Sequence, residues 1–581
     1  MYKILFNLNL FFFSKIKLII FFFFTLFRYS IIFIRRSCYI LEWDFFFFSL
    51  IRINLTLFLD KYFLCMASVV LFIRINVVSY SKYYIEGGKT NNRFLFLLIL
   101  FILSMIFFLI RPNLISIFLG WDGLGLVSYL LVNFYANKDR LNSGILTVLR
   151  NRLGDIFLII RVYFSLVIGG YRFILWDNYL RWGLFLILLA SFTKRAQLPF
   201  SSWLPFAIAA PTPISSLVHS STLVTAGVFL LLRLRDLINE DSLYIIYVRG
   251  LVTILVSGLR GIFEVDLKKV IALSTLSQLG LIIIVLGGGY KELAFFHLVI
   301  HALFKSRIFM GIGCKIHEYE GVQDSRILST RWKNPLIEFL FGVTNIALMG
   351  FPFISGFFSK DIRLEYFLCS FPRFRINFFF VLRVILTRTY RIKFILMRRF
   401  NFRNFFRKIH SRVVNKIVIF SLVFLLLFSI TFGYIYYVIF IDYFVIIDLR
   451  FTVKFFILFR IFYTLLRMYS YLLKKNFFFS YMLQCLLVCL FFLRELTSRV
   501  NKILVNYIYI FKYLDSGWIE SFKIAYSKKK IRFFYFYLEL RRVNRFFTFL
   551  FRVLVVVLFF FFFYSLFLRY YIEDIKNCFK R

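Results

Sequence analysis

The stretch that decides the fold is residues 191–227, which read SFTKRAQLPFSSWLPFAIAAPTPISSLVHSSTLVTAG. It is mostly apolar, yet it contains a lysine, Lys194, and a histidine, His219. Burying an ionisable group in lipid costs roughly 2.5 to 3.5 kcal/mol on insertion scales, so such groups persist mainly where they face a polar path. Four prolines interrupt the same stretch, and broken membrane helices are where transporters bind ions. The stretch therefore predicts part of a charge pathway inside a membrane protein.

The rest of the composition is that of a polytopic helical membrane protein. Of the 581 residues, 61% are hydrophobic, and apolar segments long enough to cross a bilayer recur along most of the chain. We expect an all-α fold with roughly fifteen to sixteen transmembrane helices of about 20 residues each. The clearest segments are 92–110, 113–136, 143–168, 211–234, 267–288, 336–359, 417–446 and 548–569.

A formal net charge of +45 could indicate a nucleic-acid-binding protein. The basic residues, however, alternate with phenylalanine and leucine, which is typical of side chains at membrane interfaces and in loops. We therefore predict contact with membrane lipids and no nucleic-acid partner. The seven cysteines include no CxxC pair, and no glycine-rich nucleotide loop follows a strand. We expect this chain to bind no metal and no cofactor.

The middle of the chain has the pattern of an inverted repeat. Residues 92–235 and 243–398 each hold about five apolar spans, and each contains a span broken by proline and glycine. The second broken span, residues 345–361, reads NIALMGFPFISGFFSKD. Broken spans at corresponding places in two halves are the sequence mark of an inverted-repeat transporter. Two unrelated kinked helices remain the alternative.

Among the acidic residues that precede Lys194, Asp122 and Asp155 lie within apolar segments. Asp122 lies in the apolar, glycine-containing segment LISIFLGWDGLGLVSYLLV, residues 114–132. It could pair with Arg152 to pack two helices, or it could face Lys194 and control its charge, because burial favours a neutral lysine and a nearby carboxylate favours a charged one. Asp155, three residues after Arg152, shares its helix face and is expected to form a structural ion pair with it. Arg195, next to Lys194, is expected at the membrane interface.

Histidines and a further lysine extend the series. His219 lies among serines and threonines whose hydroxyls could hold a water chain, so a relay role is favoured over a merely hydrogen-bonded histidine. His297, His301 and Lys305 follow at i, i+4 and i+8, one stripe of a helix. Two histidines four apart could bind zinc, but no glutamate lies between them and no third ligand is nearby. A titratable ladder is the better interpretation.

The motifs together resemble a known family. In chain order they are GWDGLGLVSYLLV, NRLGDI, the stretch quoted above from TKRAQ onward, DLKKVIALSTLSQLG, AFFHLVIHALFKSRIF and GFPFISGFFSKD. Between about residues 55 and 400 the chain is similar to the NADH dehydrogenase subunit 5 family, the distal antiporter-like membrane subunits of respiratory complex I. Arg195, Arg307 and Phe206 replace residues that are usually smaller in that family.

The resemblance implies roles for individual residues. It makes Asp122 the acid of the family's control pair and Lys194 its partner. By themselves an adjacent lysine and aspartate at a helix end are usually solvated, so Lys360 and Asp361 depend on the resemblance for their role. The candidate site residues are Asp122, Lys194, His219, His297, His301, Lys305, Lys360 and Asp361.

The resemblance also implies an organisation along the chain. A long lateral helix and an anchoring span close the family's chains, and the sequence pattern after residue 500 is similar. The expected parts are N-terminal transmembrane helices in 1–91, five-helix units in 92–235 and 243–398, additional transmembrane helices in 399–499, a lateral amphipathic helix in 500–547 and a C-terminal anchoring helix in 548–581.

The function implied by the resemblance is proton translocation driven by NADH oxidation and ubiquinone reduction elsewhere in the complex. FMN, iron-sulfur clusters and ubiquinone would be bound by other subunits, and the partners would be other membrane-arm subunits, especially the adjacent antiporter-like one. The 86 phenylalanines, interpreted as drift in a T-rich genome, and the absence of a cleavable signal favour an organelle-encoded protein of the mitochondrial inner membrane. The alternative is a monovalent cation/proton antiporter subunit without redox coupling.

Overall fold

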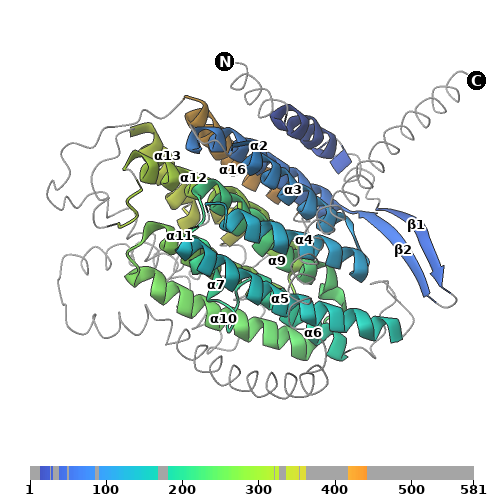
Figure 1. The fold of residues 1–581 in the computed structure, drawn as a ribbon. Helices are drawn as coiled ribbons and strands as arrows, with labels where there is room; N and C mark the ends of the chain where they lie inside the picture. The colour runs from blue at the N-terminus through green and yellow to red at the C-terminus, as the bar shows by residue number, and fades with distance from the viewer. Residues whose placement is uncertain are drawn as a thin grey trace, which may run out of the picture. The chain divides into compact units, whose positions relative to one another are not determined.

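The fold consists mainly of long apolar helices (Figure 1). The computed structural model describes residues 14–26, 28–29, 38–48, 51–85, 91–135, 137–167, 181–319, 321–325, 335–351, 354–360 and 416–440. The predicted parts 500–547 and 548–581, most of 399–499, and the expected span 548–569 lie outside the described residues.

Within the described ranges, eight helices are long and apolar enough to cross a membrane. This confirms the predicted class, a polytopic helical membrane protein, because a helix satisfies its own backbone hydrogen bonds in lipid. The eight are α2 (Lys61–Tyr84), α3 (Asn91–Ile110), α4 (Leu114–Val132), the continuous segment Thr212–Leu237, α10 (Glu240–Phe263), α11 (Leu267–Gly287), α12 (Lys291–Glu318) and Lys416–Tyr436 of α16 (Lys416–Phe440).

Shorter or more charged helices complete the described bundle. α5 (Lys138–Val167) has 30 residues but carries arginines and an aspartate in its middle, and α6 (Arg181–Lys194) and α13 (Pro335–Met349) are apolar but short. The segment Thr212–Leu237 comprises α8 (Thr212–Ile214), a π-helix η3 (Ser215–Thr222), α9 (Leu223–Leu234) and a 3-10 turn η4 (Arg235–Leu237). A one-and-a-half-turn helix, α7 (Trp203–Ala207), precedes it.

The N-terminal part contains a feature that the sequence did not predict. Strands β1 (Tyr39–Phe48) and β2 (Ile51–Leu59) pair antiparallel, with Tyr39 opposite Leu59 and a register irregularity between Asp44 and Phe46. Both strands are rich in aromatic and β-branched residues, which favour strands. The same residues also give a high hydropathy, so an apolar run of this length does not distinguish strand from helix. The predicted N-terminal helices are therefore interrupted by a two-stranded sheet at residues 39–59.

The helices divide into inner and outer ones. The most apolar window of α12 is 100% buried inside the protein, and those of α11 and Thr212–Leu237 are 94% buried, whereas those of α10 and α16 are 39% buried. α12 contacts α11, η3, α2 and α16, so other helices of the described bundle surround it. A helix that is buried on all sides can place polar groups only where neighbouring helices supply partners. The predicted His/Lys stripe lies on this central helix.

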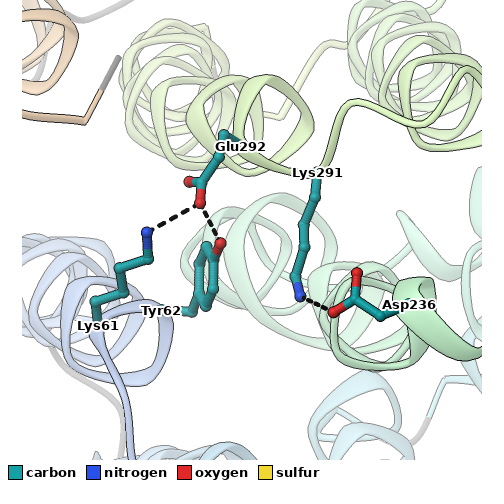
Figure 2. A network of polar contacts seen from close by, with 5 residues as sticks. All are labelled: Lys61, Tyr62, Asp236, Lys291 and Glu292. Carbon is teal, nitrogen blue, oxygen red and sulfur yellow. Dashed lines mark hydrogen bonds and ion pairs between the residues drawn. The ribbon is translucent and has the colours of Figure 1, made fainter. Parts of the chain in front are cut away.

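Two ion pairs tie the start of α12 to other helices (Figure 2). Glu292 accepts from Lys61 at 3.0 Å and from the hydroxyl of Tyr62, both at the start of α2. Lys291 pairs with Asp236 of η4 at 2.7 Å. These side chains are partly or largely exposed, and such pairs are worth about 0 to 1 kcal/mol each. Their effect is to set the register of α12 against α2 and α9.

The buried arginines differ in how far neighbouring groups compensate their charge. Arg233 of α9 donates to the carbonyl oxygens of Leu109 and Arg111 at 2.6 and 2.8 Å and lies 3.6 Å from Asp60. Arg74, in the middle of α2, is 0% exposed, and its guanidinium nitrogens have no hydrogen-bond partner among the described residues. Its Cζ atom lies 5.7 Å from the centre of the Phe101 ring. A buried charge without partners destabilises the fold.

Replacing Arg74 with serine is expected to stabilise the subunit by about 1 to 3 kcal/mol, because the desolvation cost of the guanidinium exceeds the cost of the space left behind. A serine there can donate to a carbonyl of the preceding turn, as Ser68 and Ser81 do in the same helix. The thermal unfolding midpoint of the solubilised complex measures the effect. The matched control is Arg233→Ser, which loses two carbonyl bonds and an ion pair and should lower the midpoint. A lower midpoint for Arg74→Ser would show that its charge is compensated.

Candidate functional site

The first part of the site depends on how closely α4 approaches α3. A Cβ atom added at Gly120 would lie 2.7 Å from the Cα atom of Phe108, and one at Gly123 would lie 3.3 Å from Ser104. At Gly125 nothing lies within 4 Å. The close approach therefore requires glycine at position 120, and to a lesser degree at 123. It fixes the position of the next two residues, Trp121 and Asp122.

Two acids share one arginine between α4 and α5. The Nη1 atom of Arg152 lies 2.9 Å from Oδ1 of Asp122, without hydrogen-bond alignment, and 3.4 Å from Oδ2 of Asp155. The side chain of Asp155 is 5% exposed, while those of Asp122 and Arg152 are 28% and 43% exposed. Arg152 therefore lies close to Asp122, as one interpretation of that acid requires, and also close to Asp155, as the expected structural ion pair requires. The three residues form one cluster, in which Asp155 is the buried acid.

Lys194 is the last residue of α6 and is 0% exposed. Its ammonium donates to the backbone carbonyl of Trp121 and lies 3.8 Å from the centre of the Trp121 ring. The described ion pairs do not include one between Lys194 and Asp122. Asp122, the acid predicted as the partner of Lys194, is thus connected to it through Arg152, Asp155 and Trp121.

The chain turns sharply after Lys194. Ala196 has a positive φ of 55°, and α7 begins at Trp203. Arg195 is 0% exposed and donates to the carbonyl oxygen of Gly227, so its side chain is buried between helices, and its expected interfacial position stays a prediction. A Cβ at Gly227 would lie 2.9 Å from Cγ of Arg195, which shows that the glycine makes room for this side chain.

The helix that carries His219 is a π-helix, η3, at this point. Only the backbone of His219 is described. The hydroxyls around it, which were predicted to support a water chain, donate to backbone carbonyls of the same helix. Thr222 reaches back five residues to Leu217 at 2.9 Å, and Ser221 reaches the same oxygen at 3.2 Å. These hydroxyls can still accept a hydrogen bond from another group. π-helical turns frequently occur at functional sites.

The stripe on α12 lies on one face, as the i, i+4, i+8 spacing predicts, and two of its residues contact side chains of α11. His297 and His301 are each 1% exposed, with ring centres 6.2 Å apart, and Lys305 is 0% exposed. The Lys305 ammonium donates to the hydroxyl of Ser274 on α11. Polar side chains of α11 therefore supply partners for the stripe.

The surroundings of His297 accommodate both of its protonation states. Nε2 lies 3.2 Å from Oε1 of Gln278, and Nδ1 lies 3.2 Å from the hydroxyl of Ser359. In the neutral ring, Nε2 donates to Gln278 and Nδ1 accepts from Ser359. In the protonated ring both nitrogens donate, and the Ser359 hydroxyl turns to the carbonyl of Gly356, 3.4 Å away. A proton can be gained or lost with only a hydroxyl rotation.

The second predicted break is also present. α13 ends at Met349, Gly350 has a φ of 83°, and a helix resumes over residues 355–360. Lys360 donates to the carbonyl oxygen of Leu348, in the last turn of α13. A cation at this place interacts favourably with the negative end of the helix dipole. Asp361 lies outside the described residues.

The described residues hold no group of three or more His, Cys, Asp or Glu side chains that could bind a metal ion.

The structure brings the candidate residues together in two clusters. The first joins Asp122 to Lys194 through Arg152, Asp155 and Trp121, and the second joins His297, His301 and Lys305 to α11 and to the segment that ends in Lys360. The sequence missed Trp121 and the buried position of Asp155. The tryptophan next to Asp122 in GWDG was the only available signal.

The fold and the buried cations of this chain fit the antiporter-like class of helical membrane proteins. A family model described as NADH:quinone oxidoreductase/Mrp antiporter, transmembrane, matches residues 112–387. The structure is similar to that of an Mrp complex from Dietzia sp., with a TM-score of 0.61 and 20% identity over 88% of this chain. This chain covers 57% of that one, and the likeness concerns the fold alone.

Curated relatives narrow the class. NADH-ubiquinone oxidoreductase chain 5 of Locusta migratoria is 44% identical over 63% of this chain and 67% of the relative. The proteins of the same name from Aedes aegypti and Anopheles arabiensis are 43% and 46% identical, over 66% and 57% of this chain and 67% and 89% of the relatives. The chain belongs to the NADH-ubiquinone oxidoreductase chain 5 family.

The packing at Gly120 can be tested against that at Gly125. Gly120→Ala is expected to destabilise the subunit by about 1 to 3 kcal/mol, because the new methyl group meets the backbone of α3. Gly125→Ala should leave stability unchanged or slightly higher, because alanine loses less conformational freedom than glycine. Thermal unfolding of the solubilised complex compares the two variants. Equal midpoints would show that α3 and α4 are not in close contact at Gly120.

Proposed function

We propose that this chain is a proton-translocating membrane-arm subunit of a mitochondrial NADH:ubiquinone oxidoreductase and lies in the inner membrane as a multi-pass protein. The observation that carries the proposal is the pair of fully buried lysines, Lys194 and Lys305, in a chain 43–46% identical to chain 5 relatives. A buried lysine changes charge more readily than an exposed one, which suits a proton carrier. FMN, iron-sulfur clusters and ubiquinone would be held by other subunits, and an adjacent antiporter-like subunit would be the nearest partner.

The proposed path runs from the acid cluster through the central helix. A change of charge near Asp122 alters the proton affinity of Lys194. The proton then passes by way of His219 to His301 and Lys305, with His297 beside them, and leaves toward Lys360 and Asp361. Residues 92–235 and 243–398 are proposed as the two five-helix units that carry this path. Residues 500–547 and 548–581 are proposed as the lateral helix and its anchor.

The second candidate is a monovalent cation/proton antiporter without redox coupling. The likeness to the Mrp complex and the family description favour it as an alternative, because both classes share the fold. The identity to that structure is 20%, against 44% to the Locusta relative. Co-purification with an NADH-oxidising activity that quinone-site inhibitors block distinguishes the two. A small assembly that transports sodium without NADH would replace the first proposal by the second.

Lys194→Met and Lys305→Met are expected to assemble but to lose proton pumping, because methionine keeps much of the stem volume and removes the ammonium. Protons pumped per NADH oxidised, in reconstituted vesicles, is the measurement. Lys291→Met is the matched control: it removes an ammonium from the same helix as Lys305, in an ion pair at the helix start, and should pump normally. Normal pumping by both Lys194→Met and Lys305→Met would refute the proposed path.

The acid can be tested in the same vesicles. Asp122→Asn should lower coupled turnover, whereas Asp122→Glu should largely preserve it, because the proposal requires a charge and tolerates one methylene group. Equal loss in both variants would show that Asp122 acts through helix packing.

A further inference from the structure

We propose that Trp121 is a positioning residue for proton translocation, because it alone contacts both the Lys194 ammonium and the buried acid Asp155 among the described residues. The inference deepens the proposed function and rests on it. It assigns a role to a side chain that cannot itself titrate.

Trp121 contacts the two charged groups through different atoms. Its backbone carbonyl accepts a hydrogen bond from Lys194, and the centre of its ring lies 3.8 Å from the same ammonium. Its indole Nε1–H donates to Oδ1 of Asp155 at 2.9 Å. Trp121 is 0% exposed, so none of these contacts competes with solvent. The residue therefore contacts both the ammonium and a buried carboxylate.

The contacts distinguish the two protonation states of Lys194. The face of an indole ring attracts an ammonium ion, and a carbonyl oxygen binds it more strongly than it binds a neutral amine. Both attractions weaken when Lys194 releases its proton. The orientation of the ring, which the bond to Asp155 holds, thus controls how strongly the charged form of Lys194 is favoured.

A charge change outside the cluster can reach Trp121 in two steps. Asp122 is more exposed than Asp155, and both share Arg152, at 2.9 and 3.4 Å. If Asp122 loses its charge or meets a new cation, Arg152 is drawn closer to Asp155. The carboxylate then binds the indole N–H less strongly, since a bound cation reduces its negative charge. The order of transmission is Asp122, Arg152, Asp155, Trp121, Lys194.

The surroundings keep Trp121 in place while its polar contacts change. Gly120 packs against the backbone of Phe108, and the Phe108 ring lies with its centre 5.9 Å from that of Trp121. The side chain therefore has little freedom to leave the cluster, so a change in its bond to Asp155 alters only how the ring is turned toward Lys194.

The test uses Trp121→Phe in the assembled complex, because phenylalanine keeps a ring near Lys194 and removes the N–H donor to Asp155. We expect an assembled complex that shows most of the loss in protons per NADH caused by Lys194→Met, together with a changed pH dependence of pumping. The matched control is Trp203→Phe. Trp203 is 1% exposed and donates its indole N–H to the carbonyl of Thr193 at 2.9 Å, beside Lys194. Its variant should retain the normal ratio and pH dependence.

A double-mutant comparison separates positioning from packing. In an Asp155→Asn background, Trp121→Phe should add little further loss of proton pumping. The amide oxygen of asparagine accepts from the indole N–H but carries no charge, so this hydrogen bond no longer links the indole to the acid. Additive losses, an equal loss in Trp203→Phe, or normal pumping by Trp121→Phe would each overturn the inference. If Trp121→Phe does not assemble, the Asp155→Asn variant decides alone, since it keeps an acceptor oxygen for the indole and removes the charge. A normal ratio of protons pumped per NADH and a normal pH dependence in that variant would overturn the inference. Normal pumping by Lys194→Met refutes the proposed function instead.

Discussion

The constraint on which the site depends is that a positive charge must be held inside an apolar bundle without being permanently neutralised. A direct buried ion pair would fix the charge of Lys194, and a dry apolar pocket would remove it. The structure places the ammonium between these limits. Lys194 contacts the carbonyl and the aromatic face of Trp121, which attract a cation without carrying a full negative charge, and the acid Asp155 is hydrogen-bonded to the indole of the same residue. Under the proposed function, a change in the charge of the acids would shift this balance.

The breaks in the helices make this arrangement possible. Lys194 is the last residue of α6, and Lys360 reaches the last turn of α13, so two lysines lie at the C-terminal ends of two interrupted helices. A helix C-terminus presents carbonyl oxygens without intrahelical partners, together with the negative end of the dipole. Lys360 is stabilised in this way, whereas the Lys194 ammonium donates to the carbonyl oxygen of Trp121, in the middle of α4. Prolines and glycines therefore contribute to the site because they end the helices next to which these two lysines lie.

The sequence predicted the features that depend on local spacing and missed those that depend on which helices are neighbours. Apolar runs identified the spanning helices because lipid requires a self-satisfied backbone, and the i, i+4 spacing placed His297, His301 and Lys305 on one face. Strands β1 and β2 were missed because their residues are equally apolar. The contact of Trp121 with Asp155 joins α4 to α5 across 34 residues, and no periodicity within either helix indicates it. The roles of the site residues stay predictions.

The geometry of α12 limits how a proton can move along it. The ring centres of His297 and His301 are 6.2 Å apart, and their orientation is fixed by a helix that is buried throughout, so a direct hydrogen bond of about 3 Å between them requires one ring to change its rotamer. A water molecule between the rings would bridge the gap with ordinary bond lengths. Gln278 and Ser359 already hold His297 from opposite sides, which opposes rotation of that ring. Transfer along the stripe is therefore more compatible with entry of water than with swinging of His297, and hydration of the central helix becomes the step that the acid cluster would have to control.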